Sequence, residues 1–316
     1  MNTPSSARPG PHGAVDHVVP PLDERIAGAP ISWGVSEVPG WGYQYDSATV
    51  LREMAEVGLA ATEFGPDGFL PEAPEAKVAA LAEAGLSPVG QFVPMVLHDP
   101  GYDPATEIER ALDGLVAAGA STCVLAAATG VEGYDERPAL DDTSWTTLLS
   151  NLDRLDDTVR ARGLTATLHP HVGTMVESGA EVERVLSGSH IGLCLDTGHL
   201  LIGGGDPIAL ARSHAERIAH VHLKDVRLEW ARRVQDREAT YAEAVAGGMY
   251  VPLGYGDVDV VAIVTALEDA GYAGWYVLEQ DTILAGPPDG EGTVADVRES
   301  LYQLLRISAQ RSGVGI

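Results

Sequence analysis

Short apolar runs alternate with longer amphipathic stretches along most of this 316-residue chain, and this alternation restricts its fold more than any other feature. Repeated strand–helix units build a parallel sheet in which crossover helices join the strands. Eight runs are predicted to be strands: Ala29–Trp33, Ala60–Phe64, Ser87–Phe92, Thr122–Ala127, Thr165–His169, Gly192–Leu195, Ile218–Leu223 and Tyr276–Glu279. Eight such strands favour a closed (β/α)₈ barrel over an open doubly wound sheet, for which no GxGxxG or P-loop motif is found.

The amphipathic stretches between the strands predict the surrounding helices. They are Ala48–Val57, Pro74–Ala84, Pro104–Ala118, Thr143–Arg162, Ala180–Leu186, Pro207–Glu216, Val258–Ala270 and Val294–Ser308. An extra helix is expected around Ala231–Ala246, inserted after the seventh strand. We therefore predict one barrel domain over residues 26–316, preceded by a flexible tail over residues 1–25, which is rich in Pro, Ser and Gly without periodicity.

Composition limits the classes of partner and the location. Hydrophobic residues make up 45% and charged residues 21%, as in a globular protein with a sizeable core, whereas the net charge of −26 disfavours nucleic acid. The chain has no apolar run of the roughly 18–20 residues that a membrane span needs, so we expect no membrane association and a cytoplasmic enzyme. Cys123 and Cys194 lie in apolar runs and predict no disulfide framework. The oligomeric state stays open between monomer and homo-oligomer.

Polar side chains follow the predicted strands where each one ends, which is where a barrel of this kind places its active site. They include Glu63, Gln91, His169, His171, Asp196, His199, His220, His222, Lys224, Glu279 and Asp281. Imidazole and carboxylate groups from four adjacent strands are ligands that hold Mn²⁺, Co²⁺, Zn²⁺ or Mg²⁺ and leave positions open for substrate. A single histidine at a strand end would more often be structural, but four such strands in succession favour a metal site.

Several of these residues allow two interpretations, one functional and one structural. His220 and His222 lie on one face of their strand, so one can bind metal while the other belongs to the core, and we favour His222 as the ligand. Lys224 continues that face and is either a general acid or base or a partner of Asp225 in a salt bridge. Glu63 is either a group that moves a proton or contacts substrate, or a structural carboxylate.

Other residues are expected to contact substrate. Trp33, at the end of the first strand, and Trp41, in the loop after it, could form an apolar wall for a ring, although tryptophans in such places are as often packing residues. Gln91 ends the third strand, and Tyr255 lies in a turn-rich loop that can approach a ligand closely.

The motifs as a set resemble the xylose-isomerase-like barrel superfamily, and within it the inosose dehydratases of inositol catabolism. The resemblance covers about residues 27–282 and rests on the order and spacing of His169-Pro-His171-Val-Gly-Thr, Leu-Asp196-Thr-Gly-His199, His220-Val-His222-Leu-Lys224-Asp and Gly-Trp275 leading to Glu279. It implies a divalent metal, Mn²⁺ or Co²⁺ first and Zn²⁺ or Mg²⁺ as alternatives, at the mouth of the barrel.

The same resemblance implies roles for individual residues. Asp196, His222 and Glu279 match the expected metal ligands, whereas His169 stands where related isomerases carry Glu and either binds the metal or acts on a proton. It also implies that His199 is a catalytic or supporting group and that His171 lies near the substrate. The segments Val35-Ser36-Glu37 and Pro252–Gly256 depart from the usual dehydratase pattern, and these departures favour a relative of inosose as the substrate over inosose itself.

The expected function is metal-dependent removal of water from a keto-polyol such as 2-keto-myo-inositol through an enediolate. Glu63, His169 or Lys224 could remove the proton next to the ketone, and His199 or Lys224 could assist the leaving hydroxide. A sugar or polyol isomerase or epimerase shares the enediolate and is the nearest alternative. A barrel-type nuclease is disfavoured by the charge of −26, and a non-catalytic sugar-binding barrel is the remaining alternative.

Overall fold

The computed structural model describes residues 19–131, 133–287 and 290–313. In these residues nine parallel strands form one sheet in the order β3-β2-β1-β11-β8-β7-β6-β5-β4. The strands are β1 (Ile26–Gly28), β2 (Ala61–Thr62), β3 (Ser87–Pro88), β4 (Gly90–Val96), β5 (Thr122–Ala128), β6 (Thr165–Leu168), β7 (Gly192–Asp196), β8 (Ile218–Leu223) and β11 (Tyr276–Leu278).

The sheet closes on itself because its two ends are one chain segment. β3 and β4 are separated by Val89 alone, and they pair on opposite sides, β3 with β2 and β4 with β5. The backbone also bridges this point, since Val89 donates to Thr62 and Phe64 donates to Gly90. Nine strand segments therefore occupy eight barrel positions, and the predicted (β/α)₈ barrel in a single domain is confirmed.

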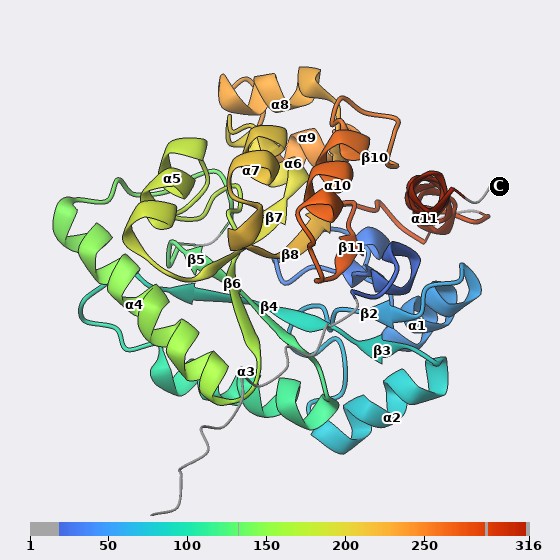
Figure 1. Cartoon of the computed structure of the whole chain (residues 1–316), viewed down its shortest axis with the longest axis horizontal. Coiled ribbons are helices and arrows are strands. Elements are labelled where there is room, and N and C mark those ends of the chain that lie inside the picture. The colour runs from blue at the N-terminus through green and yellow to red at the C-terminus, as the bar shows by residue number, and fades with distance from the viewer. Residues whose placement is uncertain (1–18, 132, 288–289, 314–316) are drawn as a thin grey trace, which may run out of the picture.

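Helices surround the barrel (Figure 1) and cover the outer faces of its strands. They are α1 (Ser47–Glu56), α2 (Pro74–Ala84), α3 (Ala105–Ala118), α4 (Asp142–Ala161), α5 (Gly179–Gly188), α6 (Thr197–Ile202), α7 (Pro207–Ser213), α10 (Val260–Asp269) and α11 (Thr293–Ser312). Local signals set several of their limits: Ser178 and Glu181 form a capping box at the start of α5, and Gly85 ends α2 in the left-handed region at φ 71°. Apolar faces of the helices pack on strands such as β5, which is buried almost throughout.

The insertion after β8 contains two helices, where the sequence predicted one. α8 (Leu228–Gln235) and α9 (Tyr241–Ala246) are separated at Thr240, whose side chain caps α9. The antiparallel pair β9 (Asp225–Val226) and β10 (Tyr250–Val251) closes the insertion at its base. This arrangement carries Tyr241 and Tyr250 to the carboxyl end of the barrel.

The first predicted strand, Ala29–Trp33, is wrong in its position. β1 ends at Gly28, and a 3₁₀-helix, η2 (Pro30–Trp33), follows it. Pro30 fixes φ and lacks an N–H, which suits the first position of a helical turn, and Gly34 ends the turn at φ 75°.

The predicted tail over residues 1–25 is described in part. Its first 18 residues lie outside the described ones, while η1 (Leu22–Arg25) packs on the barrel with Leu22 and Arg25 buried. Arg25 binds both carboxylate oxygens of Glu268 at 2.8 Å, so the end of the predicted tail is attached to the domain. A short 3₁₀-helix, η3 (Ala215–Arg217), leads into β8. No helix among the described residues has both the length and the apolar character that crossing a bilayer requires.

Candidate metal centre

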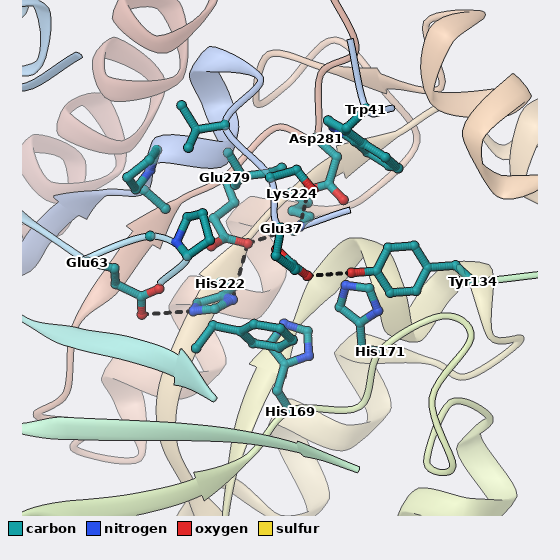
Figure 2. A pocket seen from close by; sticks show the side chains of 18 residues that line it. Glu37, Trp41, Glu63, Tyr134, His169, His171, His222, Lys224, Glu279 and Asp281 are labelled. Carbon is teal, nitrogen blue, oxygen red and sulfur yellow. Dashed lines mark hydrogen bonds and ion pairs between the residues drawn. The ribbon is translucent and has the colours of Figure 1, made fainter. Parts of the chain in front are cut away.

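Four side chains from adjacent strand ends converge at the carboxyl end of the barrel, and Figure 2 shows three of them, His169, His222 and Glu279. They are His169 after β6, Asp196 at the end of β7, His222 in β8 and Glu279 after β11. Asp196 Oδ2 lies 3.3 Å from His169 Nε2 and 3.8 Å from His222 Nδ1, and Glu279 Oε2 lies 3.2 Å from His222 Nδ1. Their candidate ligand atoms all lie within 4.8 Å of one another, which is close enough for one ion to contact all four.

Hydrogen bonds outside this group leave its inner atoms free for a cation. Asp196 Oδ1 accepts from the His199 amide at 2.7 Å, and His222 Nε2 donates to Glu63 Oε1 at 3.0 Å. Asp196 Oδ2 and His222 Nδ1 are buried and find no hydrogen-bond partner among the described residues. A buried polar atom without a partner is costly, and a mixed set of imidazoles and carboxylates is what divalent metals bind. These residues therefore fit a divalent metal.

The candidate ligands shift one another's pKa values, so that the carboxylates are ionised and an imidazole is protonated. Burial by itself raises the pKa values of Asp196 and Glu279, but Lys224, His169 and His222 together outweigh it and hold both below their usual values. Burial alone would lower the pKa of His222, yet Cys194, Glu279 and Glu63 raise it well above the usual value. A divalent cation would bind in competition with this imidazole proton.

Glu63 supports His222 from behind. Its Oε1 accepts hydrogen bonds from His220 Nε2 at 2.7 Å and from His222 Nε2 at 3.0 Å. Burial raises the pKa of Glu63, but the two imidazoles outweigh it and bring the value to about 2. Glu63 is thus an ionised carboxylate that fixes the tautomer of His222 with Nδ1 toward the candidate ligands.

Lys224 is a buried ammonium beside the same group. Its Nζ lies 2.9 Å from Glu279 Oε2 and 3.6 Å from Asp196 Oδ2, and it forms a short ion pair with Asp281. Burial lowers the pKa of Lys224, but these carboxylates raise it well above the usual value. Asp281 also accepts a hydrogen bond from the Tyr241 hydroxyl, which fixes the carboxylate that holds the ammonium. The predicted salt bridge between Lys224 and Asp225 is wrong, because Asp225 instead accepts backbone N–H groups of residues 254–258.

His171 and His199 stack on each other with ring centroids 3.7 Å apart. His171 Nδ1 lies 2.7 Å from the carbonyl of Val172, so Nδ1–H donates there and Nε2 keeps its lone pair. Burial, His169 and Lys224 lower the pKa of His171 to about 3. His199 Nε2 lies 3.2 Å from Lys224 Nζ and accepts from the ammonium. His171, His199 and Asp281 also form a ligand-like group, but the Lys224 ammonium already provides its cation.

The pocket above the four candidate ligands brings together only part of the predicted site. Glu63, His169, His171, His222, Lys224 and Glu279 line it, together with Trp41. His199 contacts Lys224 and His171, is fully buried, and is not among the described residues that line the pocket.

Three predicted substrate contacts need correction. Trp33 lies in η2 and not at a strand end; it is fully buried, and its Nε1 donates to Glu53 at 2.8 Å. Tyr255 is 61% exposed and is not among the described residues that line the pocket. Gln91 points into a neighbouring cavity, where its amide donates to Asp67 at 2.9 Å.

The sequence interpretation assigned no role to several residues that build the site. Asp281 follows Glu279 at i+2 after a strand, a spacing that could have placed both on the same side. Tyr241, Tyr134 and Glu37 come from loops and an inserted helix, and no local pattern links them. Tyr134 donates to Glu37 Oε1 at 2.7 Å across the mouth of the pocket (Figure 2).

Comparison with known proteins agrees with this geometry. The family described as xylose isomerase-like TIM barrel matches residues 51–304. The chain is 32% identical over 278 residues to an inosose dehydratase of Geobacillus kaustophilus, a match that covers 83% of this chain and 90% of the relative. These matches confirm the predicted family resemblance.

Solved structures show the same fold at lower identity. A probable 3-DHS dehydratase of Bacillus anthracis gives a TM-score of 0.65 at 14% identity and covers 89% of this chain and 98% of its own. A 3-keto-D-glucoside 4-epimerase of E. coli gives a TM-score of 0.63 at 19% identity and covers 89% of this chain and 99% of its own. The chain belongs to the xylose isomerase-like TIM barrel family.

Proposed function

We propose that this protein is a metal-dependent dehydratase that removes water from a keto-polyol, with 2-keto-myo-inositol as the first substrate to test. The observation that carries the proposal is the placement of an imidazole with an unbonded Nε2 and of an ammonium on the pocket that three of the four candidate ligands line. His171 and Lys224 both line that pocket, with Lys224 Nζ 2.9 Å from Glu279 Oε2. The relatives at about 30% identity that are named inosose dehydratases support the reaction type, and the substrate is a small sugar or polyol.

His169, Asp196, His222 and Glu279 are the residues that would hold the metal, with Mn²⁺ or Co²⁺ first and Zn²⁺ or Mg²⁺ as alternatives. When bound, such an ion supplies Lewis-acid stabilisation of the negative charge that develops on the ketone oxygen. The buried unpaired atoms of Asp196 and His222 support this assignment. Glu63 contributes by holding His222 in the tautomer that presents Nδ1.

Proton removal is assigned to His171. Its Nδ1–H is held by the Val172 carbonyl, so Nε2 is free to accept the proton from the carbon next to the ketone. The electron pair of that C–H bond forms the new C=C bond, and the C–O bond on the neighbouring carbon breaks. The sequence interpretation named Glu63, His169 or Lys224 as the base. Glu63 already accepts two imidazole N–H groups, His169 is needed among the ligands, and Lys224 is an ammonium.

Proton donation is assigned to Lys224. The departing hydroxide takes a proton from Nζ and leaves as water, and the enol that remains tautomerises to a 1,2-diketone. Asp281, fixed by Tyr241, and His199 hold Nζ at the pocket wall. After each turnover His171 releases its proton to solvent and Lys224 Nζ regains one from solvent, so atoms and charge balance over the cycle.

A direct test incubates the purified protein with 2-keto-myo-inositol and Mn²⁺ or Co²⁺. The expected result is growth of the ultraviolet absorbance of the enone or dione product, lost after treatment with a chelator. Metal-loaded protein that produces no absorbance change would exclude this substrate.

The epimerase or isomerase alternative is supported by fold-level neighbours such as the E. coli epimerase. It shares the α-proton removal but returns the proton without losing hydroxide. Deuterium from solvent in recovered or isomeric sugar, without dehydrated product, would favour it. The cytoplasmic location, the oligomeric state and the domain limits of residues 26–316 stay predictions.

A further inference from the structure

A second cavity of ≈ 600 Å³ opens directly beside the metal pocket. It lies between the loop that follows β2, the first half of β4 and helix α3. The two cavities share wall residues, so they are neighbouring compartments of one mouth. The shared residues are Glu37, Gly65, Pro66 and Phe92.

The two compartments differ in size. The metal pocket measures ≈ 70 Å³. At roughly 10–15 Å³ per water molecule on this measure, it has room for about five waters, comparable to one hydroxylated six-membered ring. The second cavity alone falls within the range of roughly 300–1,000 Å³ that is usual for ligand sites. A single ring at the metal pocket would therefore leave the larger compartment unused.

The second cavity has more acidic than basic side chains in its wall. Five carboxylates line it against two cations, Lys77 and Arg110; the carboxylates belong to Glu37, Asp67, Glu72, Glu107 and Asp113. Arg110 pairs with Asp67, and Lys77 Nζ lies over the Phe64 ring at 4.6 Å from its centroid. The excess of carboxylates disfavours an anionic ligand.

Gln91 and the neighbouring aromatic side chains give the cavity the means to bind hydroxyl groups. Gln91 is 6% exposed, and its amide is held by Asp67, so its direction is fixed. Phe92 lies between this cavity and the metal pocket and presents an apolar surface to both. A fixed amide and several carboxylates beside an aromatic face suit a neutral polyhydroxylated group, which has donors, acceptors and apolar C–H surfaces.

We propose that the second cavity binds a neutral sugar or cyclitol unit joined through oxygen to the ring that reacts at the metal pocket. The substrate class is then an O-substituted keto-polyol, and Gln91 and Phe92 contribute to specificity. The identity of the reacting ring rests on the proposed function, whereas the second binding site rests on the cavity itself.

The test measures binding of unreactive alcohols to the full-length protein, with and without Mn²⁺, by titration calorimetry. Galactinol and maltose are the two-ring probes, and myo-inositol and glucose are their single-ring counterparts. At least one two-ring probe is expected to bind about tenfold more tightly than its counterpart. Equal affinities within both pairs would overturn the proposal, and tighter binding of glucose 6-phosphate than of glucose would overturn the neutral character of the site.

Two variants on helix α3 test whether the tighter binding of the two-ring probes arises in the second cavity. Gly114 lines the cavity, and a Cβ added there would lie 3.7 Å from Lys77 Nζ, so Gly114→Phe would fill the space. We expect this variant to lose the two-ring advantage. Val116→Phe lies two residues further along the same helix on an exposed position outside the cavity wall and should keep it. Retention of the advantage in Gly114→Phe, or its equal loss in Val116→Phe, would contradict the proposal.

Thr106→Trp is a second cavity-filling variant, and it serves if Gly114→Phe fails to fold by circular dichroism. Turnover of 2-keto-myo-inositol by the unmodified protein is followed separately. Absence of that turnover would count against the proposed dehydratase alone, while absence of a two-ring advantage would count against the second binding site alone.

Discussion

His222 donates from Nε2 to Glu63 Oε1 at 3.0 Å, and this hydrogen bond turns its Nδ1 toward Asp196 and Glu279. The imidazole therefore links a carboxylate behind the site to the group of candidate ligands. The same carboxylate oxygen is shared with His220 at 2.7 Å, so Glu63 holds two rings at once. The affinity of the site for metal is therefore expected to depend on this supporting hydrogen bond as well as on the ligands.

Glu63→Gln should weaken metal binding by about 10–100-fold, the usual effect of losing a group that orients a ligand imidazole. The neutral amide oxygen accepts the His222 N–H more weakly than the carboxylate does, so it holds this tautomer less firmly. Titration of metal-free protein with Mn²⁺ measures the change. Glu56→Gln removes an exposed carboxylate of equal charge and should have no effect. If Glu63→Gln binds Mn²⁺ with unchanged affinity, Glu63 does not support the metal site.

Glu279→Gln should remove most of the stabilisation that metal provides. A ligand present at 100 times its Kd raises the free energy of unfolding by about 2.7 kcal/mol. The unmodified protein should show an increase of this size when Mn²⁺ is added and lose it on chelation, while the variant should respond weakly. Thermal unfolding at several Mn²⁺ concentrations gives the comparison. Equal responses of the two proteins would exclude Glu279 as a ligand.

Lys224→Met should lower kcat for dehydration by about 10²–10⁴-fold, the range expected for loss of a positioned proton donor. Bound metal should stay at one ion per chain, because Met removes the ammonium without removing a candidate ligand. Lys77→Met, which removes a lysine from the neighbouring cavity, is the matched control and should keep kcat for the unsubstituted ring. Loss of bound metal in Lys224→Met would assign the effect to the metal site instead.

Glu181→Gln should destabilise the fold at neutral pH but not in acid. The Glu181 carboxylate accepts the Ser178 amide at 2.8 Å and pairs with Arg137 at 2.7 Å. Burial raises the pKa of Glu181, but these contacts lower it below its usual value. A lowered native pKa stabilises the folded state above the unfolded pKa, roughly pH 4.3, and this contribution is lost as the pH falls through the native pKa.

The expected loss at pH 7 is about 1 kcal/mol in the free energy of unfolding. Urea unfolding at pH 7 and at pH 3.5 should show the difference between the two proteins shrinking in acid. Glu183→Gln on the same helix is the control, since its side chain is exposed. A difference that is the same at both pH values would show that the charge of Glu181 is not the cause.

The sequence determined the barrel, because the alternation of apolar runs and amphipathic stretches is a local property that each segment carries by itself. It also determined that His169, Asp196, His222 and Glu279 meet, because parallel strands of a barrel all end at the same rim. Local sequence patterns predicted the correct element where one signal was present and the wrong element where two signals competed. At Ala29–Trp33 the apolar run indicated a strand, but Pro30 started a helical turn and carried Trp33 into the core.

Only the tertiary structure decided which residues at the barrel rim form hydrogen bonds and ion pairs, and which of them are protonated. The ammonium state of Lys224 depends on Asp281, which is 57 positions away, and that carboxylate depends on Tyr241 from an inserted helix. Gln91 lies in a second cavity, where Asp67 accepts a hydrogen bond from its amide and helix α3 forms part of the wall. The pattern of strands in the sequence does not predict either neighbour. Protonation and access depend on distances between segments remote in the chain, and short-range sequence patterns contain no such distances.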